Sequence, residues 1–161
     1  MIIGAVKEKK KFENRVSISP DDVKNYVKAG HQVFIEKGAG SLSGFNDKSY
    51  KESGATLSTS KEVFKNSDII LKINCPTPDE SKLIKNNSMV ISQISIQNNQ
   101  DSIKILNSKK ISAFALELVP RITRAQDMDI LSSQANLAGY HAVIDAAQEF
   151  NRVLPLSLIH I

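Results

Sequence analysis

The chain has 161 residues, of which 41% are hydrophobic and 24% charged. This length predicts one domain, and this composition argues against both a disordered chain and a membrane protein. The formal net charge is +4, but the lysines are spread along the whole chain among carboxylates. That distribution predicts a solvated basic surface and not a nucleic-acid-binding face.

The N-terminus and the cysteine content bear on the compartment. The chain begins Met-Ile-Ile-Gly-Ala-Val and only then reaches its first lysines, which reverses the charged-then-apolar order of a secretory signal peptide. The single cysteine, Cys75, permits no internal disulfide. Both features predict a reducing compartment, either the cytosol or its organellar equivalent. Only four of the 21 basic residues are arginine, so an arginine is a mild indication that its position requires a planar, bidentate hydrogen-bond donor.

Strand-like and helix-like segments alternate along the first 118 residues. The predicted elements in chain order are a strand at 2–6, a helix that is capped by Ser19-Pro20-Asp21-Asp22 and stops at Gly30, a strand at 32–36, a loop at 38–44, weak helices at 47–53 and 60–66, a strand at 68–74, a helix at 79–85, a strand at 89–94, a helix at 100–109 and a strand at 112–118. This alternation predicts an α/β fold with a doubly wound, mostly parallel sheet of the Rossmann-like or flavodoxin-like type. Ligands of such sheets gather at the carboxyl ends of the strands.

From Asp129 onward the pattern changes, because apolar residues are interleaved with serine, alanine and glycine. Asp129 is a suitable N-cap, so we expect one long helix over 129–150. A helix of this length exceeds what a crossover needs and is expected to link one domain to the next. The chain is therefore divided into an α/β domain at 1–128, an interdomain helix at 129–153 and a tail at 154–161.

A glycine string follows the second predicted strand, Gly38-Ala-Gly40-Ser-Leu-Ser-Gly44. In a dinucleotide fingerprint such glycines open a long helix whose N-terminus receives the pyrophosphate. Here Phe45-Asn46-Asp47 follows, which is further turn chemistry. The context favours a loop, and the chain has no convincing site for the pyrophosphate of a dinucleotide.

Two basic residues and the cysteine are candidates at the ligand edge of the sheet. Lys72 lies near the carboxyl end of a predicted buried strand, so its ammonium either serves a ligand or snorkels past the end of the sheet. Arg15 follows the first strand, and its guanidinium either reaches the same edge or lies on the surface. Cys75 has no histidine near it in the sequence, which favours a small residue at a strand end over a nucleophile.

The densest group of polar functional residues follows the last predicted strand, in the segment 120–136. It contains Arg121 and Arg124, two of the four arginines, together with Gln126 and Asp129. This charge and amide content exceeds what a connecting loop needs and favours a binding loop. The histidines are interpreted as incidental, namely His31, His141 and His160.

Residues 121–136, with Leu137-Ala-Gly-Tyr140 after them, closely resemble the NAD(H)-binding component of proton-translocating NAD(P) transhydrogenase, the N-terminal part of its alpha subunit. Glu13-Asn-Arg-Val16, Gly38-Ala-Gly40 and Leu71-Lys72-Ile73-Asn74 fit the same family, which also contains alanine dehydrogenase. The resemblance covers residues 1 to about 153.

This resemblance implies a first domain that is Rossmann-like but lacks the nucleotide fingerprint, and a second domain that binds NAD(H). It implies that Arg121, Asp129 and Ser132 help to hold the nicotinamide end of NAD(H). Gln126 would reach toward the NADP(H) of a partner component, and hydride would pass directly between the two nicotinamides. No metal is implied.

The two branches of the family need different chemistry. Interconversion of an amino acid and an oxo acid moves a proton with each hydride and needs a general acid–base group, whereas transfer between two nicotinamides needs mainly positioning. Arg15 and Lys72 match the substrate-carboxylate ligands of alanine dehydrogenase. Alanine dehydrogenases also place a histidine after the strand matching 89–94, where this chain has Ser95-Ile96-Gln97. The missing histidine favours transhydrogenase, a hypothesis that alanine oxidation by the full-length protein would contradict.

The resemblance further implies a homodimer of the NAD(H)-binding component, and membrane-spanning and NADP(H)-binding partner components. It places the protein in the cytoplasm, peripheral on the inner (plasma) membrane through those partners. The tail at 154–161 departs from the family pattern, from which we expect a truncated, inactive fragment. Two alternatives stay open: the N-terminal domain of an alanine dehydrogenase-like amino-acid dehydrogenase, and a non-enzymatic interaction module.

Overall fold

The structure is a computed structural model that describes residues 1–152. The chain divides into two compact units, the first Met1–Leu118 and the second beginning at Val119. The predicted tail at 154–161, which includes His160, lies outside the described residues.

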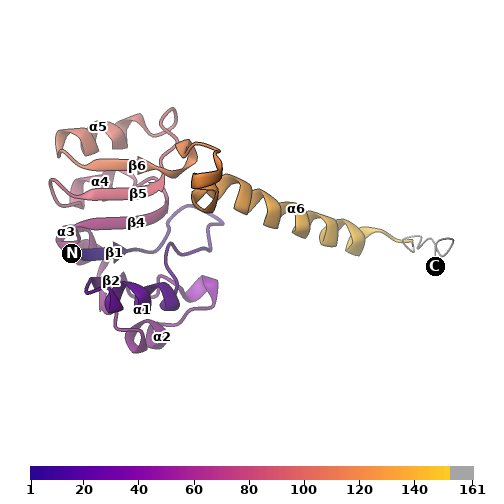
Figure 1. The fold of residues 1–161 in the computed structure, drawn as a ribbon, viewed down its shortest axis with the longest axis horizontal. Coiled ribbons are helices and arrows are strands. Elements are labelled where there is room, and N and C mark those ends of the chain that lie inside the picture. The colour runs from indigo at the N-terminus through magenta and orange to yellow at the C-terminus, as the bar shows by residue number, and fades with distance from the viewer. Residues whose placement is uncertain (153–161) are drawn as a thin grey trace. The chain divides into compact units, whose positions relative to one another are not determined.

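The first unit is built on a six-stranded sheet in which all neighbouring strands are parallel (Figure 1). The strands are β1 (Ile2–Ala5), β2 (Gln32–Glu36), β3 (Thr56–Ser58), β4 (Ile69–Asn74), β5 (Met89–Gln93) and β6 (Ser112–Ala115). Their order across the sheet is β3-β2-β1-β4-β5-β6, the doubly wound order of a Rossmann-like fold. The predicted fold class is confirmed. The chain direction across the sheet reverses between β1 and β4, where a ligand site is expected at the carboxyl ends.

The α-helices of the first unit are α1 (Pro20–Lys28), α2 (Asp47–Glu52), α3 (Ser60–Asn66), α4 (Pro78–Leu83) and α5 (Gln100–Ser108). Three of them begin with the same pair of hydrogen bonds. The side chain of a Ser or Thr N-cap accepts a hydrogen bond from the backbone N–H of an acidic residue three positions later, and the carboxylate of that residue accepts one from the backbone N–H of the N-cap. This capping box satisfies two otherwise unpaired N–H groups and sets the helix start. The three pairs are Ser19 with Asp22, Thr59 with Glu62, and Thr77 with Glu80.

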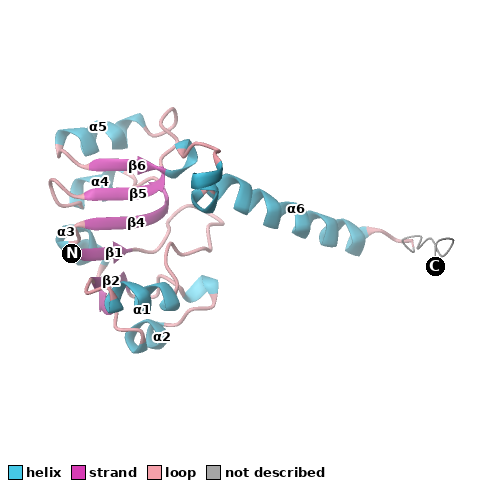
Figure 2. Cartoon of the chain, in the orientation of Figure 1, coloured by secondary structure: helices cyan, strands magenta, loops and turns pink. Residues whose placement is uncertain are grey.

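A hydrophobic layer lies on each face of the sheet. On one face, Val23 of α1 packs with Ala5, Val33 and Ile35 of the sheet. Tyr50 of α2 is a further buried member of this layer. The layer on the other face is supplied mainly by α3 and α5, and its members are Val6, Val63, Phe64, Ile70, Ile84, Val90, Leu106 and Ile111. Figure 2 shows α1 in front of the sheet over β2. The two layers hold the strand ends in place and so position the edge at which ligands gather.

Two strands differ from the sequence prediction. The sequence predicts no strand at 56–58, because this short segment carries no apolar run; it pairs with β2, with Ile35 opposite Leu57. The predicted strand at 112–118 is wrong at its end, because β6 stops at Ala115 and a 3-10 turn follows. Glu117 in this turn accepts hydrogen bonds from the backbone N–H groups after β5, which bends the chain away from the sheet.

The glycine segment 38–44 forms a turn, as predicted. Gly38 and Gly44 have φ angles of 73° and 82°, which glycine adopts without strain. A short 3-10 turn lies between them, and Asp47 Oδ1 accepts a hydrogen bond of 2.8 Å from the Gly38 N–H. In the described chain this segment opens no long helix, so it lacks the geometry of a dinucleotide fingerprint.

The second unit consists of a 3-10 helix (Thr123–Met128) and the long helix α6 (Ile130–Glu149), which has 20 residues. Asp129 is the N-cap of α6, and its carboxylate accepts hydrogen bonds of 3.0 Å from the N–H groups of Leu131 and Ser132. The long C-terminal helix is therefore confirmed. None of the helices within residues 1–152 is long and apolar enough to cross a membrane.

Candidate functional site

A cavity of about 430 Å³ lies in the first unit at the carboxyl ends of β4 and β5, beside the loop that follows β1. This is the edge at which the strand order predicts a ligand. Its lining is polar and consists of Glu8, Lys9, Lys10, Lys72, Asn74, Cys75, Thr77, Glu80, Gln93, Ser95, Asn98 and Asn99.

Lys72 is the charged centre of this cavity. Its side chain is 2% exposed, and Nζ lies 3.5 Å from Glu8 Oε2 and 3.4 Å from Glu80 Oε2. Glu80 Oε1 lies 3.2 Å from Lys9 Nζ. Buried charges are costly unless they are paired, and here two ammonium groups and two carboxylates compensate one another. Lys72 therefore does not snorkel into solvent.

Hydrogen bonds hold both carboxylates in place. The backbone N–H of Ile73 donates to Glu8 Oε1 at 2.7 Å, and that of Thr77 donates to Glu80 Oε2 at 3.0 Å. Burial acts to raise the pKa of Glu80, but the Lys72 ammonium, with the Thr77 N–H and Lys9, holds this pKa below its ordinary value. Glu80 is thus ionised at neutral pH, and Lys72 is matched by anions of the protein itself.

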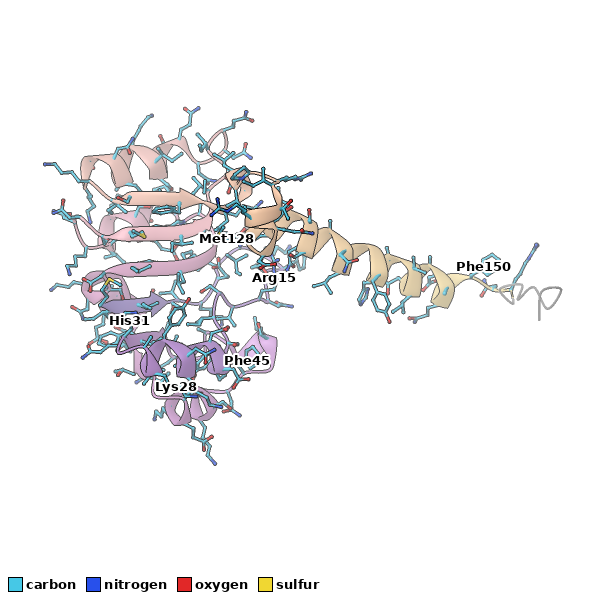
Figure 3. All side chains as sticks on the ribbon, in the orientation of Figure 1. Arg15, Lys28, His31, Phe45, Met128 and Phe150 are labelled. Carbon is cyan, nitrogen blue, oxygen red and sulfur yellow. The ribbon has the colours of Figure 1, made fainter. Side chains whose placement is uncertain are left out.

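Arg15 lies on the loop after β1 (Figure 3) and joins the same edge through Glu13. Its Nε and Nη2 donate to the two oxygens of Glu13, each at 2.8 Å, and Asn74 Nδ2 donates to Glu13 Oε2 at 3.2 Å. The hydrogen bonds from Arg15 dominate over burial, and with Asn74 they lower the pKa of Glu13 to about 2. The guanidinium side chain is 48% exposed and so is presented to solvent, in contrast to Lys72.

Among the described residues, Cys75 does not form a nucleophilic site with His31 or His141. Cys75 is half-buried, and burial raises the pKa of its thiol to about 11, so it is protonated at neutral pH. His31 directly precedes β2 and therefore lies at the opposite edge of the sheet from the cavity (Figure 3). His141 lies on the exposed surface of α6, where its Nδ1 is 3.0 Å from Asp145.

The second unit has a pocket of its own, of about 330 Å³. The 3-10 helix contributes Gln126 to it, and the N-terminus of α6 contributes Asp129 and Ser132. Its lining consists of Arg121, Ile122, Thr123, Gln126, Asp129 and Ser132. The three residues expected at the nicotinamide of NAD(H), namely Arg121, Asp129 and Ser132, thus line one pocket together with Gln126, which is expected to reach toward NADP(H).

Asp129 organises this pocket. Its Oδ1 caps α6, and its Oδ2 accepts a hydrogen bond of 2.6 Å from Ser132 Oγ. Arg121 Nε lies 3.9 Å from Oδ2, with an exposed side chain. The hydrogen bonds from Ser132, and then that from the Leu131 N–H, lower the pKa of Asp129. The pocket therefore combines an ionised carboxylate with a guanidinium, an amide and a hydroxyl.

The structure places the predicted residues in two groups. Arg15 and Lys72 belong to the first unit, and the other four to the second. The sequence analysis missed Glu8 and Glu80, which surround Lys72. Glu80 is recognisable in the sequence as the acidic residue of a capping box, but no local pattern shows that its carboxylate faces a lysine of the preceding strand.

Comparisons with known proteins place these features in a family. Residues 4–138 match the family model described as alanine dehydrogenase/PNT, N-terminal domain. The NAD(P) transhydrogenase alpha subunit of Rhodospirillum rubrum is 42% identical over 164 aligned positions, which cover 98% of this chain and 43% of that protein. The alanine dehydrogenase of Methanococcus maripaludis is 37% identical over 92% of this chain and 39% of its own length.

Solved structures agree with these matches. The transhydrogenase from Sinorhizobium meliloti has a TM-score of 0.91 and 41% identity, covering 99% of this chain and 48% of its own. An L-alanine dehydrogenase structure has a TM-score of 0.70 and 32% identity, covering 74% of this chain and 33% of its own. The chain thus spans less than half the length of these relatives. On the match over residues 4–138, the chain belongs to the family defined by the N-terminal domain of alanine dehydrogenase and NAD(P) transhydrogenase.

Proposed function

We propose that this chain is the N-terminal domain of the NAD(H)-binding component of a proton-translocating NAD(P) transhydrogenase, which passes hydride directly from NADH to NADP. The transhydrogenase subunit of Rhodospirillum rubrum is 42% identical, against 37% for the alanine dehydrogenase. Because the chain spans under half of these relatives, the complete reaction belongs to the longer protein and its partners.

The observation that carries this proposal is the convergence of Arg121, Gln126, Asp129 and Ser132 around one pocket. A nicotinamide carries a carboxamide, which offers both donors and an acceptor. The ionised Asp129 supplies an acceptor, while the Ser132 hydroxyl and Arg121 supply donors. The residues present therefore fit the nicotinamide end of NAD(H), and Gln126 is left to reach toward NADP(H).

The main task of these residues would be to position the two nicotinamide rings for hydride transfer. NAD(H) supplies the hydride when it is bound, and no substrate proton moves with it. The protein must hold two rings in a productive geometry, for which hydrogen-bonding side chains suffice. Neither pocket is lined by a histidine among the described residues, so the acid–base group of an amino-acid dehydrogenase has no candidate there.

The domain limits, partners and location follow the same proposal. Residues 1–128 would form the α/β domain and residues 129–153 the interdomain helix that leads to a nucleotide-binding domain. The partners would be a second copy and the membrane-spanning and NADP(H)-binding components. The protein would be cytoplasmic and held at the inner membrane by those partners.

An alanine dehydrogenase-like activity is the second candidate, favoured by the presence of Arg15 and Lys72 at one sheet edge. Lys72 weighs against it, because its ammonium already faces Glu8 and Glu80 within 3.5 Å. A substrate carboxylate would have to compete with two fixed anions for this ammonium.

A chimera tests the proposal. Residues 1–152 replace the matching segment of the Rhodospirillum rubrum alpha subunit, and hydride transfer from NADH to NADP is measured with the partner subunits of that enzyme. We expect activity within about tenfold of the parent, and a loss of about 100-fold for Gln126→Ala because the rings lose their alignment. Gln148→Ala, on the exposed surface of α6, is the matched control and should leave the rate unchanged.

The reciprocal chimera separates the two candidates. The same residues replace the matching segment of the Methanococcus maripaludis alanine dehydrogenase, and alanine oxidation is measured. We expect none, because no histidine follows β5 at Ser95-Ile96-Gln97. Alanine oxidation here, together with a folded but inactive transhydrogenase chimera, would refute the proposal.

A further inference from the structure

The pocket of the second unit is built by one continuous stretch of chain. All of its lining lies within residues 121–132. The backbone N–H of Ala125 donates to the carbonyl oxygen of Ile122 at 2.9 Å. The backbone N–H of Asp129 donates in the same way to the carbonyl oxygen of Gln126 at 3.1 Å. These bonds join residues only three positions apart, so the backbone around the pocket is held locally.

Two polar side chains of this pocket share one face of the 3-10 helix. A 3-10 helix has three residues per turn, so side chains three positions apart lie one above the other. Thr123 and Gln126 have this spacing, and both line the pocket. Ala125, on a different side of the helix, is buried. Thr123 therefore lies one turn before the residue that is expected to reach toward NADP(H).

The polar side chains of the pocket differ in how far their hydrogen bonds are already used. Asp129 Oδ1 accepts from the backbone of α6, and Asp129 Oδ2 accepts from the Ser132 hydroxyl at 2.6 Å. Arg121 Nε lies 3.9 Å from the same Oδ2. Within residues 1–152, the Thr123 hydroxyl has no hydrogen-bond partner. It can therefore bond a ligand without giving up an existing bond.

We infer that Thr123 is a further nicotinamide-binding residue, whose hydroxyl donates a hydrogen bond to the carboxamide oxygen of NAD(H). This inference rests on the proposed nicotinamide site. A carboxylate such as Asp129 only accepts hydrogen bonds, and Ser132 would have to give up its bond to Asp129 in order to donate. A threonine hydroxyl donates freely.

The bond would serve to orient the ring. The carboxamide is attached to the same ring that carries the hydride, so a fixed donor at its oxygen restricts the rotation of that ring in the pocket. Restricting the ring in this way keeps the reacting carbon in a productive geometry. Thr123 would thus hold one ring, while Gln126, one helical turn later, reaches toward the other nucleotide.

The test measures NADH binding by fluorescence titration of the transhydrogenase chimera, without its partner subunits. Thr123→Val replaces the hydroxyl with a methyl group and should raise the dissociation constant of NADH about 3–10-fold, the effect of one hydrogen bond between neutral groups. Thr123→Ser keeps the hydroxyl and should stay within about twofold of the parent. Thr56→Val, at an exposed threonine of β3, is the matched control and should leave the constant unchanged.

Two analogues of NADH identify the bonded atom. The thionicotinamide analogue has sulfur in place of the carboxamide oxygen. Sulfur is a weak acceptor, so Thr123→Val should change the dissociation constant of this analogue by less than about twofold. The 3-acetylpyridine analogue keeps the oxygen and lacks the amino group, so it should show the same loss as NADH. A merely structural effect of the substitution would weaken the binding of all three nucleotides equally.

Two results would overturn the inference. One is unchanged NADH binding in Thr123→Val; the other is a loss for the thionicotinamide analogue as large as that for NADH. Failure of the proposed function is seen separately, as a chimera that binds NADH but transfers no hydride to NADP when the partner subunits are added.

Discussion

Lys72 carries a buried positive charge at the carboxyl ends of the strands. The free-energy cost of burying this charge is offset by its ion pairs with Glu8 and Glu80. The two carboxylates come from the loop after β1 and from α4, so the charge cluster joins three segments. Arg15 differs, because it is paired with Glu13 yet half exposed. At this scale the edge contains one cation that is sequestered by the protein and one that is presented to solvent.

Lys72→Met should destabilise the first unit by about 3–5 kcal/mol, because it leaves two buried carboxylates without their shared cation. Lys82→Met is the matched control, since Lys82 pairs with Asp79 at 2.9 Å on the surface, with side chains 64% and 91% exposed. That change should cost under about 0.5 kcal/mol. Urea unfolding measures both variants; equal effects would show that the buried cluster contributes no more than a surface pair.

Glu13 makes the stability depend on pH. Its pKa is lowered from 4.5 to about 2 in the folded protein, chiefly by hydrogen bonds from Arg15. A depressed pKa contributes stability that is complete above the unfolded pKa and is lost as the pH falls toward the folded one. The difference in unfolding free energy between the parent and Glu13→Gln should therefore be largest at about pH 6 and shrink between about pH 4.5 and pH 2. Urea unfolding across this range checks it, and a constant difference would assign the effect to packing.

At the scale of elements, the sheet depends on a close approach between β1 and the end of α3. A Cβ on Gly4 would lie 2.2 Å from Ser67 Oγ and 2.8 Å from Val63 Cγ1. Val63 is fully buried in the core layer that contains Phe64 and Ile70, so displacing it would disturb the packing of that layer. Gly4 is therefore required by contact and not by its backbone angles.

Gly4→Ala should destabilise the first unit by about 1–3 kcal/mol through overpacking. Gly139→Ala is the opposite case, since a Cβ on Gly139 would have nothing within 4 Å and the residue is inside α6. Alanine at position 139 should stabilise the helical conformation of α6 by about 0.5–1 kcal/mol relative to glycine. Thermal unfolding followed by circular dichroism distinguishes them, and a neutral Gly4→Ala would contradict the close packing of β1 on α3.

The sequence predicts an element well when the contacts that define it join residues close together in the chain. The helices that begin with a capping box are predictable because Ser19, Thr59 and Thr77 bond residues only three positions away. The strand β3 is not, because it depends on pairing with β2, which lies about twenty residues earlier in the chain. The end of β6 is likewise set by Glu117, whose partners follow β5.

At the scale of the whole molecule, the described residues include a pocket that we propose for a nicotinamide, but no glycine turn among them opens a long helix that could receive a pyrophosphate. The segment 38–44 ends in a left-handed glycine and a turn instead of opening a long helix. A polypeptide of these 161 residues should therefore bind NADH with a dissociation constant no tighter than about 1 mM. Fluorescence titration measures this, with the transhydrogenase chimera as positive control; a micromolar constant would reveal a nucleotide site in the chain itself.

The sequence by itself determined the α/β class, the long helix after Asp129, the glycine turn and the family, because these depend on local periodicity, capping and motifs. It also identified Arg121, Gln126, Asp129 and Ser132, which lie close together in the chain and line one pocket. Only the tertiary structure decided the surroundings of Lys72, because Glu8 and Lys72 are brought together by the order of strands in the sheet. The alignment of Leu71, Ile91 and Phe114 across β4, β5 and β6 was likewise decided there, since strand register sets which side chains share a face of the sheet.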